Sequence, residues 1–101
     1  MLNTRMNKTD ETLTFYLEGD LDRITSADFE KEIFACLSDV TELVIDLEQL
    51  EYISSAGLRS FVKLQKQMDK QGAMRLVHVK PGVFEIFDLG GFTDYLTIEA
   101  D

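Results

Sequence analysis

The stretch YISSAGLRSF, residues 52–61, joins a strand-like segment to a helix-like segment. Upstream, residues 43–47 form a nearly continuous apolar run, which favours a strand of a parallel sheet covered on both faces. Downstream, apolar residues recur at helical spacing and predict an amphipathic helix over residues 56–70, with Gly72 at its end. Residues 48–53 are expected to form a short connector. The stretch therefore predicts a strand, a connector and a helix in succession.

Two strands and one helix are predicted ahead of this unit. Residues 13–17 alternate between apolar and polar side chains, as one buried face of a strand requires. A weaker strand over residues 2–6 is joined to it by a turn, which suggests a hairpin. A helix is expected over residues 26–38, because the hydroxyl of Thr25 or Ser26 can accept from its first free N–H groups.

The same alternation continues after residue 72. Residues 74–79 predict a strand, Pro81 suits the first turn of a helix, and the pair Gly90-Gly91 ends that helix. A last short strand is expected over residues 95–98. The predicted order is β-β-α-β-α-β-α-β, which favours an α/β fold with a mainly parallel sheet and covering helices.

Charge and composition limit the partners and the compartment. The chain has 19 acidic and 10 basic residues and a formal net charge of −9. This charge disfavours nucleic acid and anionic membranes, and it leaves room for a partner with a basic docking face. The single cysteine, Cys36, allows no internal disulfide, and no segment suits a signal peptide or a membrane span. We therefore expect one cytoplasmic domain over residues 1–101.

Side chains typical of enzymes and metal sites are scarce. The one histidine, His78, is expected on a sheet face, and Cys36 is expected to be buried within the first helix. No cysteine–histidine set has metal-ligand spacing, and no phosphate-binding glycine loop or nucleophile motif is present. A carboxylate site for Mg²⁺ at Asp20, Asp22 and Asp46 is an alternative, although acids are common at strand ends. We predict no enzyme, no cofactor and no metal site.

The serine pair Ser54-Ser55 has two interpretations that the residues alone leave open. Either serine can simply cap the following helix. Alternatively, a phosphoryl group there would face free backbone N–H groups and the positive end of a helix dipole, after a strand of a parallel sheet. No basic partner is evident that would make either serine a nucleophile. Gly57, which has no Cβ, leaves space for close approach by another backbone.

Three blocks of the chain resemble the STAS domain of bacterial anti-sigma-factor antagonists. They are GDLD at Gly19–Asp22 followed by Thr25, DLEQLEYISSAGLR at Asp46–Arg59, and KPGVFEIFDLGGF at Lys80–Phe92. Their order and spacing match over almost the whole chain. The resemblance implies the STAS fold, a mixed sheet of about five strands with helices in the order predicted above. It also implies a switch rather than an enzyme.

The resemblance further implies how such a switch works. The unphosphorylated protein binds an anti-sigma factor that is also an ATP-dependent serine kinase, and this binding frees the sigma factor. The kinase phosphorylates a serine at the start of the second helix, which ends the binding, and a PP2C-type phosphatase restores it. By register the acceptor is Ser55, two residues before Gly57, with Ser54 as the less favoured acceptor. Ser54 stands where members of the family often have Asp.

A partner-binding surface is implied as well. Its residues are Asp20, Asp22, Thr25, Ser54, Ala56, Gly57, Leu58 and Arg59. Asp20 and Asp22 correspond to an acidic loop near the acceptor, where they would repel an added phosphate. We expect a monomer. The alternative function is a non-switched structural subunit of a transporter or scaffold complex, in which Ser55 only caps its helix.

Overall fold

The computed structural model describes residues 1–100, which form a five-stranded sheet with three α-helices and one 3₁₀ turn. In chain order the elements are β1 (Leu2–Thr9), β2 (Thr12–Leu21), α1 (Arg23–Phe34), β3 (Glu42–Ile53), α2 (Ser55–Gln71), β4 (Ala73–Val79), α3 (Pro81–Leu89), η1 (Phe92–Asp94) and β5 (Ile98–Ala100). This confirms the predicted order of strands and helices and the α/β class. None of the helices in this range is long and apolar enough to cross a membrane.

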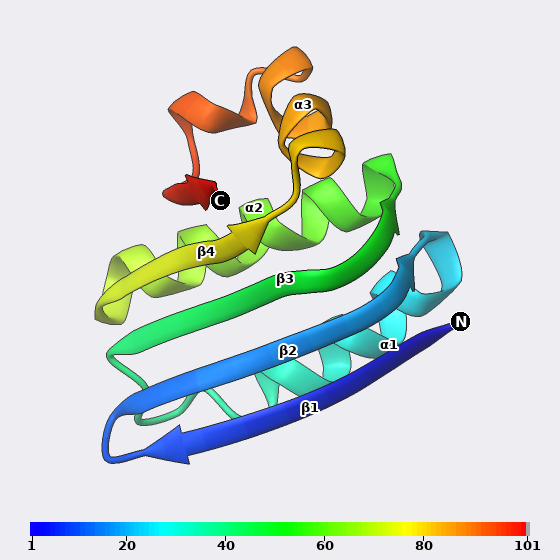
Figure 1. The fold of residues 1–101 in the computed structure, drawn as a ribbon. Helices are drawn as coiled ribbons and strands as arrows, with labels where there is room; N and C mark the ends of the chain where they lie inside the picture. Colours follow the sequence, from blue (N-terminus) through cyan, green and yellow to red (C-terminus); the bar gives the residue numbers. More distant parts are fainter. Residues whose placement is uncertain (101) are drawn as a thin grey trace.

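The sheet is mixed, with strand order β1-β2-β3-β4-β5. β1 runs antiparallel to β2, whereas β2, β3, β4 and β5 are parallel to one another. Parallel neighbours need crossover connections, and α1, α2 and α3 supply them. The carboxyl ends of β2, β3 and β4 therefore point to the same edge of the sheet, where the three helices begin (Figure 1). This edge carries the candidate site.

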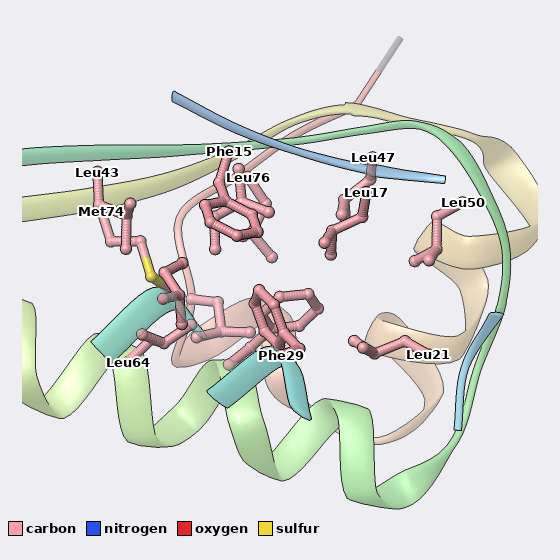
Figure 2. Packing of buried hydrophobic residues seen from close by; sticks show 14 of the residues in the cluster. Phe15, Leu17, Leu21, Phe29, Leu43, Leu47, Leu50, Leu64, Met74 and Leu76 are labelled. Carbon is pink, nitrogen blue, oxygen red and sulfur yellow. The ribbon is translucent and has the colours of Figure 1, made fainter. Parts of the chain in front are cut away.

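The hydrophobic core fills the space between the sheet and the helices (Figure 2). A row of aromatic rings crosses it from β2 to α3. Phe15 on β2 contacts Phe29 on α1 edge to face, with 5.6 Å between the ring centroids, and Phe29 contacts Phe61 on α2 at 6.0 Å. Phe61 in turn lies 5.9 Å from Phe87 on α3. Such ring pairs add about 0.5–1.5 kcal/mol each beyond their burial, so the row ties all three helices to the sheet.

The other face of the sheet is open, so the prediction of a strand covered on both faces was wrong. In Figure 1, α1 and α2 lie behind the sheet, and no element of residues 1–100 covers the front. Asp46 interrupts the apolar run of β3 at an outward position and is half-buried. Val44, the other outward residue of the run, is buried in a depression that Thr14 and Val77 of the neighbouring strands also line. Val44 is therefore buried by side chains of the neighbouring strands and not by a second layer of helices.

The first helix begins and ends earlier than predicted. α1 starts at Arg23 instead of residue 26, and it stops at Phe34 instead of residue 38. The prediction placed the cap at Thr25 or Ser26, but the N-cap is Asp22. Because the helix is short, Cys36 follows it and is half-buried, so the predicted burial of this thiol within the helix was wrong.

Two strand boundaries also differ from the prediction. β3 continues to Ile53, so residues 48–53 belong to the strand and not to a connector. Leu47, Leu50 and Ile53 are buried at a spacing of three, and the β2–β3 register shifts twice along this segment. These irregularities hide the period of two by which a strand is recognised. The last strand begins at Ile98, later than the predicted 95–98, because the 3₁₀ turn precedes it.

Candidate functional site

The start of α2 is bonded directly to the end of β2. The backbone N–H of Ser54 donates to the carbonyl oxygen of Leu21 at 2.9 Å, and the Ser54 hydroxyl donates to the same oxygen at 3.2 Å. The Ser54 Oγ also accepts from the backbone N–H of Gly57 at 3.3 Å, which makes Ser54 the N-cap of α2. Both the proton and a lone pair of this hydroxyl are therefore engaged inside the fold.

Ser55 differs from its neighbour in every one of these respects. It is the first residue of α2 and it is exposed. Among residues 1–100 its hydroxyl makes no hydrogen bond, whereas the hydroxyl of Ser54 makes two. The free N–H groups of the first turn and the positive end of the helix dipole face the same solvent. A phosphoryl group on Ser55 would therefore displace no internal contact and would meet a favourable local field.

The acidic loop is held by the cap of α1. The Asp22 Oδ1 accepts from the backbone N–H groups of Ile24 at 2.9 Å and Thr25 at 2.8 Å. In return, the Thr25 Oγ1 accepts from the backbone N–H of Asp22 at 2.9 Å and donates to the carbonyl oxygen of Asp20 at 2.8 Å. The backbone bond from Thr25 is the main cause that lowers the pKa of Asp22, against the opposing effect of burial. Thr25 is thus the third residue of the helix and the reciprocal partner of its cap.

Asp20 lies beside the N-terminus of the chain. Its carboxylate is 3.6 Å from the α-ammonium of Met1, and its backbone N–H donates to the Met1 carbonyl oxygen at 3.0 Å. The neighbouring Gly19 has a φ of +108°, and a Cβ there would lie 2.2 Å from the same carbonyl oxygen. Glycine is therefore required at this bend, which brings the N-terminus to the site edge.

The predicted partner-binding residues of α2 differ in exposure. Arg59 is exposed, Ala56 is half-buried, and Gly57 and Leu58 are buried. A Cβ on Gly57 would lie 2.9 Å from side-chain atoms of both Ile53 and Leu21. The space that glycine leaves is thus filled by side chains of this chain, and the prediction that another backbone approaches there was wrong. Gly57 and Leu58 set the position of α2, while Arg59 is available to a partner.

Two exposed apolar side chains at this edge were not predicted as part of the site. The side chain of Ile24, in the first turn of α1, is 70% exposed, and that of Tyr52, near the end of β3, is 51% exposed. Tyr52 lies opposite Asp20 in the β2–β3 ladder. Apolar side chains within a polar rim are typical of protein-binding surfaces. Their position in the sequence could have indicated this exposure. Each lies two residues from the N-cap of a helix, Ile24 from Asp22 and Tyr52 from Ser54, and helix starts at this edge face solvent.

A polar contact fixes α2 against α1. The buried hydroxyl of Ser60 donates to the carboxylate of Glu30, which also pairs with the Lys63 ammonium at 3.1 Å. Burial disfavours the charge on Glu30, but the hydrogen bonds from Ser60 and Lys63 outweigh this effect and lower its pKa. The contact fixes the position of the first turns of α2 along the axis of α1.

The alternative Mg²⁺ site is not formed. Asp20 lies opposite Tyr52 in the β2–β3 ladder, whereas Asp46 is six residues earlier on β3 and lies opposite Tyr16. Six residues of strand span roughly 20 Å, so Asp46 cannot share an ion with Asp20 and Asp22. Asp46 therefore lies too far from Asp20 and Asp22 for the three acids to form the alternative Mg²⁺ site.

Comparison with known proteins identifies the family to which this fold belongs. A family model described as STAS domain matches residues 3–101. The chain belongs to the STAS domain family. The family that the three sequence blocks indicated is therefore confirmed. The edge of the sheet that carries Ser54 and Ser55 belongs to a STAS domain.

The relatives of this STAS domain include regulatory and transport proteins. It is 37% identical over 89 residues to the "Putative anti-sigma factor antagonist BtrV" of Bordetella bronchiseptica, a match that covers 86% of this chain and 77% of that one. It is 26% identical over 101 residues to the intermembrane phospholipid transport system binding protein MlaB of Haemophilus influenzae, covering 95% and 96% of the two chains. The crystal structure of an anti-sigma factor antagonist from Mycobacterium paratuberculosis superposes with a TM-score of 0.88 at 23% identity, covering 98% of this chain and 86% of that one.

Proposed function

We propose that this STAS domain is an anti-sigma-factor antagonist that phosphorylation of Ser55 switches off. In its unphosphorylated form it binds an anti-sigma factor that is also a serine kinase, and so frees the target of that factor. The observation that carries the proposal is the contrast between the two serines. The Ser54 hydroxyl is engaged by Leu21 and Gly57, whereas the Ser55 hydroxyl is exposed at the first position of α2. A kinase can therefore reach Ser55 without opening the fold.

The charge around Ser55 accounts for a loss of binding after phosphorylation. Phosphoserine adds about −1.5 to −2 charges at pH 7, next to a loop that already carries Asp20 and Asp22. The dipole of α2 stabilises this charge as long as it is solvated. A docked partner would have to desolvate it beside two carboxylates, and a buried charge without a partner costs several kcal/mol. We expect the affinity to fall by about 100-fold or more, which corresponds to about 2.8 kcal/mol.

The surface around Ser55 has the composition of a docking site. Ile24 and Tyr52 supply exposed apolar area, and Arg59 lies one helical turn after Ser55 on α2. The net charge of −9 favours a partner with a basic face, because opposite charges speed the encounter. The partner in this proposal is a protein kinase that uses ATP, so the proposal places the domain in the cytoplasm. A phosphatase of the PP2C type would reverse the switch.

The test uses the cognate kinase, ATP and intact-mass analysis of the wild type, Ser54→Ala and Ser55→Ala, and it adds Ser55→Asp for the binding measurement. We expect a single phosphate on the wild type and on Ser54→Ala, and none on Ser55→Ala. Binding to the kinase, measured by calorimetry without ATP, should remain tight for Ser55→Ala and fall by about 100-fold for Ser55→Asp. Equal binding of the last two variants would overturn the switch. Phosphate on Ser54 alone would overturn the choice of acceptor.

A second candidate follows from the relative named MlaB, which belongs to a phospholipid transport system. In that case the same edge would hold the domain in a transport complex without a phosphorylation cycle. Ser55→Asp and Ser55→Ala would then associate with the complex equally, because no charge change is used. Co-purification of both variants with membrane transport subunits, in equal amounts and without any phosphorylated form in cells, would favour this candidate over the first.

A further inference from the structure

The open face of the sheet carries a second polar cluster, on strands β3 and β4. It consists of Asp46, Glu48 and His78. One oxygen or nitrogen atom from each of the three side chains lies within 4.8 Å of the other two, and the Asp46 Oδ2 is 2.8 Å from the His78 Nδ1. The cluster joins an imidazole to two carboxylates, which is a donor set that metal ions use.

The two carboxylates share a face because β3 alternates regularly there. Leu47 points into the core, so its neighbours Asp46 and Glu48 point to the open face. The Asp46 side chain is only 13% exposed, and its Oδ1 accepts from the backbone N–H of Glu48 at 2.9 Å. This bond fixes one oxygen of Asp46 and leaves the other directed at His78.

His78 reaches the open face through an irregularity of β4. Met74 and Leu76 point into the core, so regular alternation would send His78 there as well. Instead, His78 has a φ of +55°, and the register with β5 shifts between Leu76 and Val79. Val77 and His78 consequently both line the depression on the open face, and Val79 returns to the core. Bulges of this kind re-aim a side chain.

We propose that Asp46, Glu48 and His78 bind a divalent transition-metal ion of the Zn²⁺ type. The imidazole nitrogen favours Zn²⁺ over Mg²⁺, which is bound through oxygen ligands. Bonds of about 2.0–2.1 Å in a tetrahedral Zn²⁺ site place the ligand atoms about 3.3 Å from one another. The pair Asp46–His78 is close to this spacing, and the exposed side chain of Glu48 completes it by a rotamer change. Three protein ligands leave a fourth position open for water or for a donor from another molecule.

The surroundings of the cluster are compatible with a bound cation. The guanidinium of Arg75, which lines the same depression, pairs with Glu42 at 3.5 Å and with Glu99 at 3.3 Å. Arg5 lies over the ring of Tyr16, 4.4 Å from the centroid. The charge of Arg75 is therefore balanced by two other carboxylates, and Arg5 is held over an aromatic ring. Among residues 1–100, neither cation forms an ion pair with Asp46 or Glu48.

The test is a Zn²⁺ titration of the tag-free protein, followed by calorimetry and by the NMR signals of the imidazole. His78 is the sole histidine of the chain, so its ring signals report on the proposed site alone. The titration is made in a Cys36→Ser background, because a thiolate is itself a good Zn²⁺ ligand. We expect binding of one ion per chain, a shift of the His78 ring signals at the same stoichiometry, and no such shift with Mg²⁺.

Variants separate this site from adventitious binding. Asp46→Asn and His78→Asn should weaken Zn²⁺ binding by about tenfold or more, that is by at least about 1.4 kcal/mol. Asn is chosen at 78 because it tolerates a positive φ, and circular dichroism confirms that each variant is folded. Glu85→Gln, on the exposed side of α3 and away from the cluster, should bind as the parent does. Unshifted His78 signals in a large excess of Zn²⁺, or equal affinities of parent, Asp46→Asn and His78→Asn, would overturn the proposal.

Discussion

The hydroxyl of Ser54 donates to the carbonyl oxygen of Leu21 at 3.2 Å, and this bond closes the start of α2 onto the end of β2. The two residues are 33 positions apart in the chain. The same hydroxyl caps the helix through Gly57, so a single side chain holds both the helix end and the strand end. The exposed hydroxyl of Ser55 next to it makes no such bonds, so alanine should destabilise the domain at position 54 and leave it nearly unchanged at position 55.

Ser54→Ala should destabilise the domain more than Ser55→Ala. Loss of an N-cap costs about 0.5–2 kcal/mol, and the Leu21 carbonyl also loses one of its donors. Ser55→Ala removes an exposed hydroxyl without a partner and should change the free energy of unfolding by less than about 0.5 kcal/mol. Urea denaturation of both variants measures the difference. A larger loss for Ser55→Ala would show that Ser54 is not the effective cap.

Ser55→Asp should fold as stably as the wild type. The added carboxylate gains about 0.3–1 kcal/mol from the dipole at the start of α2, and repulsion from Asp20 offsets part of this gain. We expect a free energy of unfolding within about 0.5 kcal/mol of the wild type. Urea or thermal denaturation checks this value. If the stability is unchanged, a loss of kinase binding by Ser55→Asp is due to the added charge and not to unfolding. A strongly destabilised Ser55→Asp would mean that the helix start cannot accept a negative group.

Gly57→Ala and Gly82→Ala should shift stability in opposite directions. The new Cβ at 57 would lie 2.9 Å from atoms of Leu21 and Ile53, and overpacking of this kind costs about 1–3 kcal/mol. This cost exceeds the gain of up to about 1 kcal/mol in helix propensity. At Gly82, in the first turn of α3, nothing lies within 4 Å of the new Cβ, so only the gain remains. Thermal denaturation should rank Gly82→Ala above the wild type and Gly57→Ala below it.

Glu30 should make the domain less stable in acid. Its pKa is lowered in the folded state, so its contribution is complete above the ordinary value of 4.5 and is lost as the pH falls through the lower folded value. Glu30→Gln cannot titrate, and it should cost about 1 kcal/mol at pH 7 and less below pH 4. Unfolding free energies measured from pH 7 to pH 3 test whether the stability difference between the wild type and Glu30→Gln shrinks as the pH falls. Glu85→Gln, on the exposed side of α3, serves as the matched control and should run parallel to the wild type.

The order of strands and helices could be predicted because it is encoded locally. The alternation at residues 13–17 and the apolar stripe of residues 56–70 each lie within one segment, and both elements formed as expected. The start of α1 was ambiguous for the same local reason, since Asp22, Thr25 and Ser26 are all good capping residues within five positions. The reciprocal bonds between Asp22 and Thr25 decide it, and only the folded backbone shows them.

The site was predictable in position but not in detail. The sequence indicated that one of the two serines caps α2, but the choice depends on Leu21, which arrives from another strand. The burial of Val44 on the open face depends in the same way on side chains of β2 and β4. The direction of His78 depends on a positive φ, which β-strand patterns do not foresee. Contacts between distant segments and local irregularities therefore account for what the sequence left open.

The bond from the Asp20 N–H to the Met1 carbonyl oxygen has a practical consequence. It anchors the first residue at the edge that carries Ser55, with the α-ammonium 3.6 Å from the Asp20 carboxylate. The α-amine offers a point of attachment for a label at this edge. A fluorophore attached there would sit next to the proposed docking surface and report on partner arrival without any substitution. A bulky tag fused ahead of Met1 would instead obstruct that surface, so affinity tags belong at the other end of the chain.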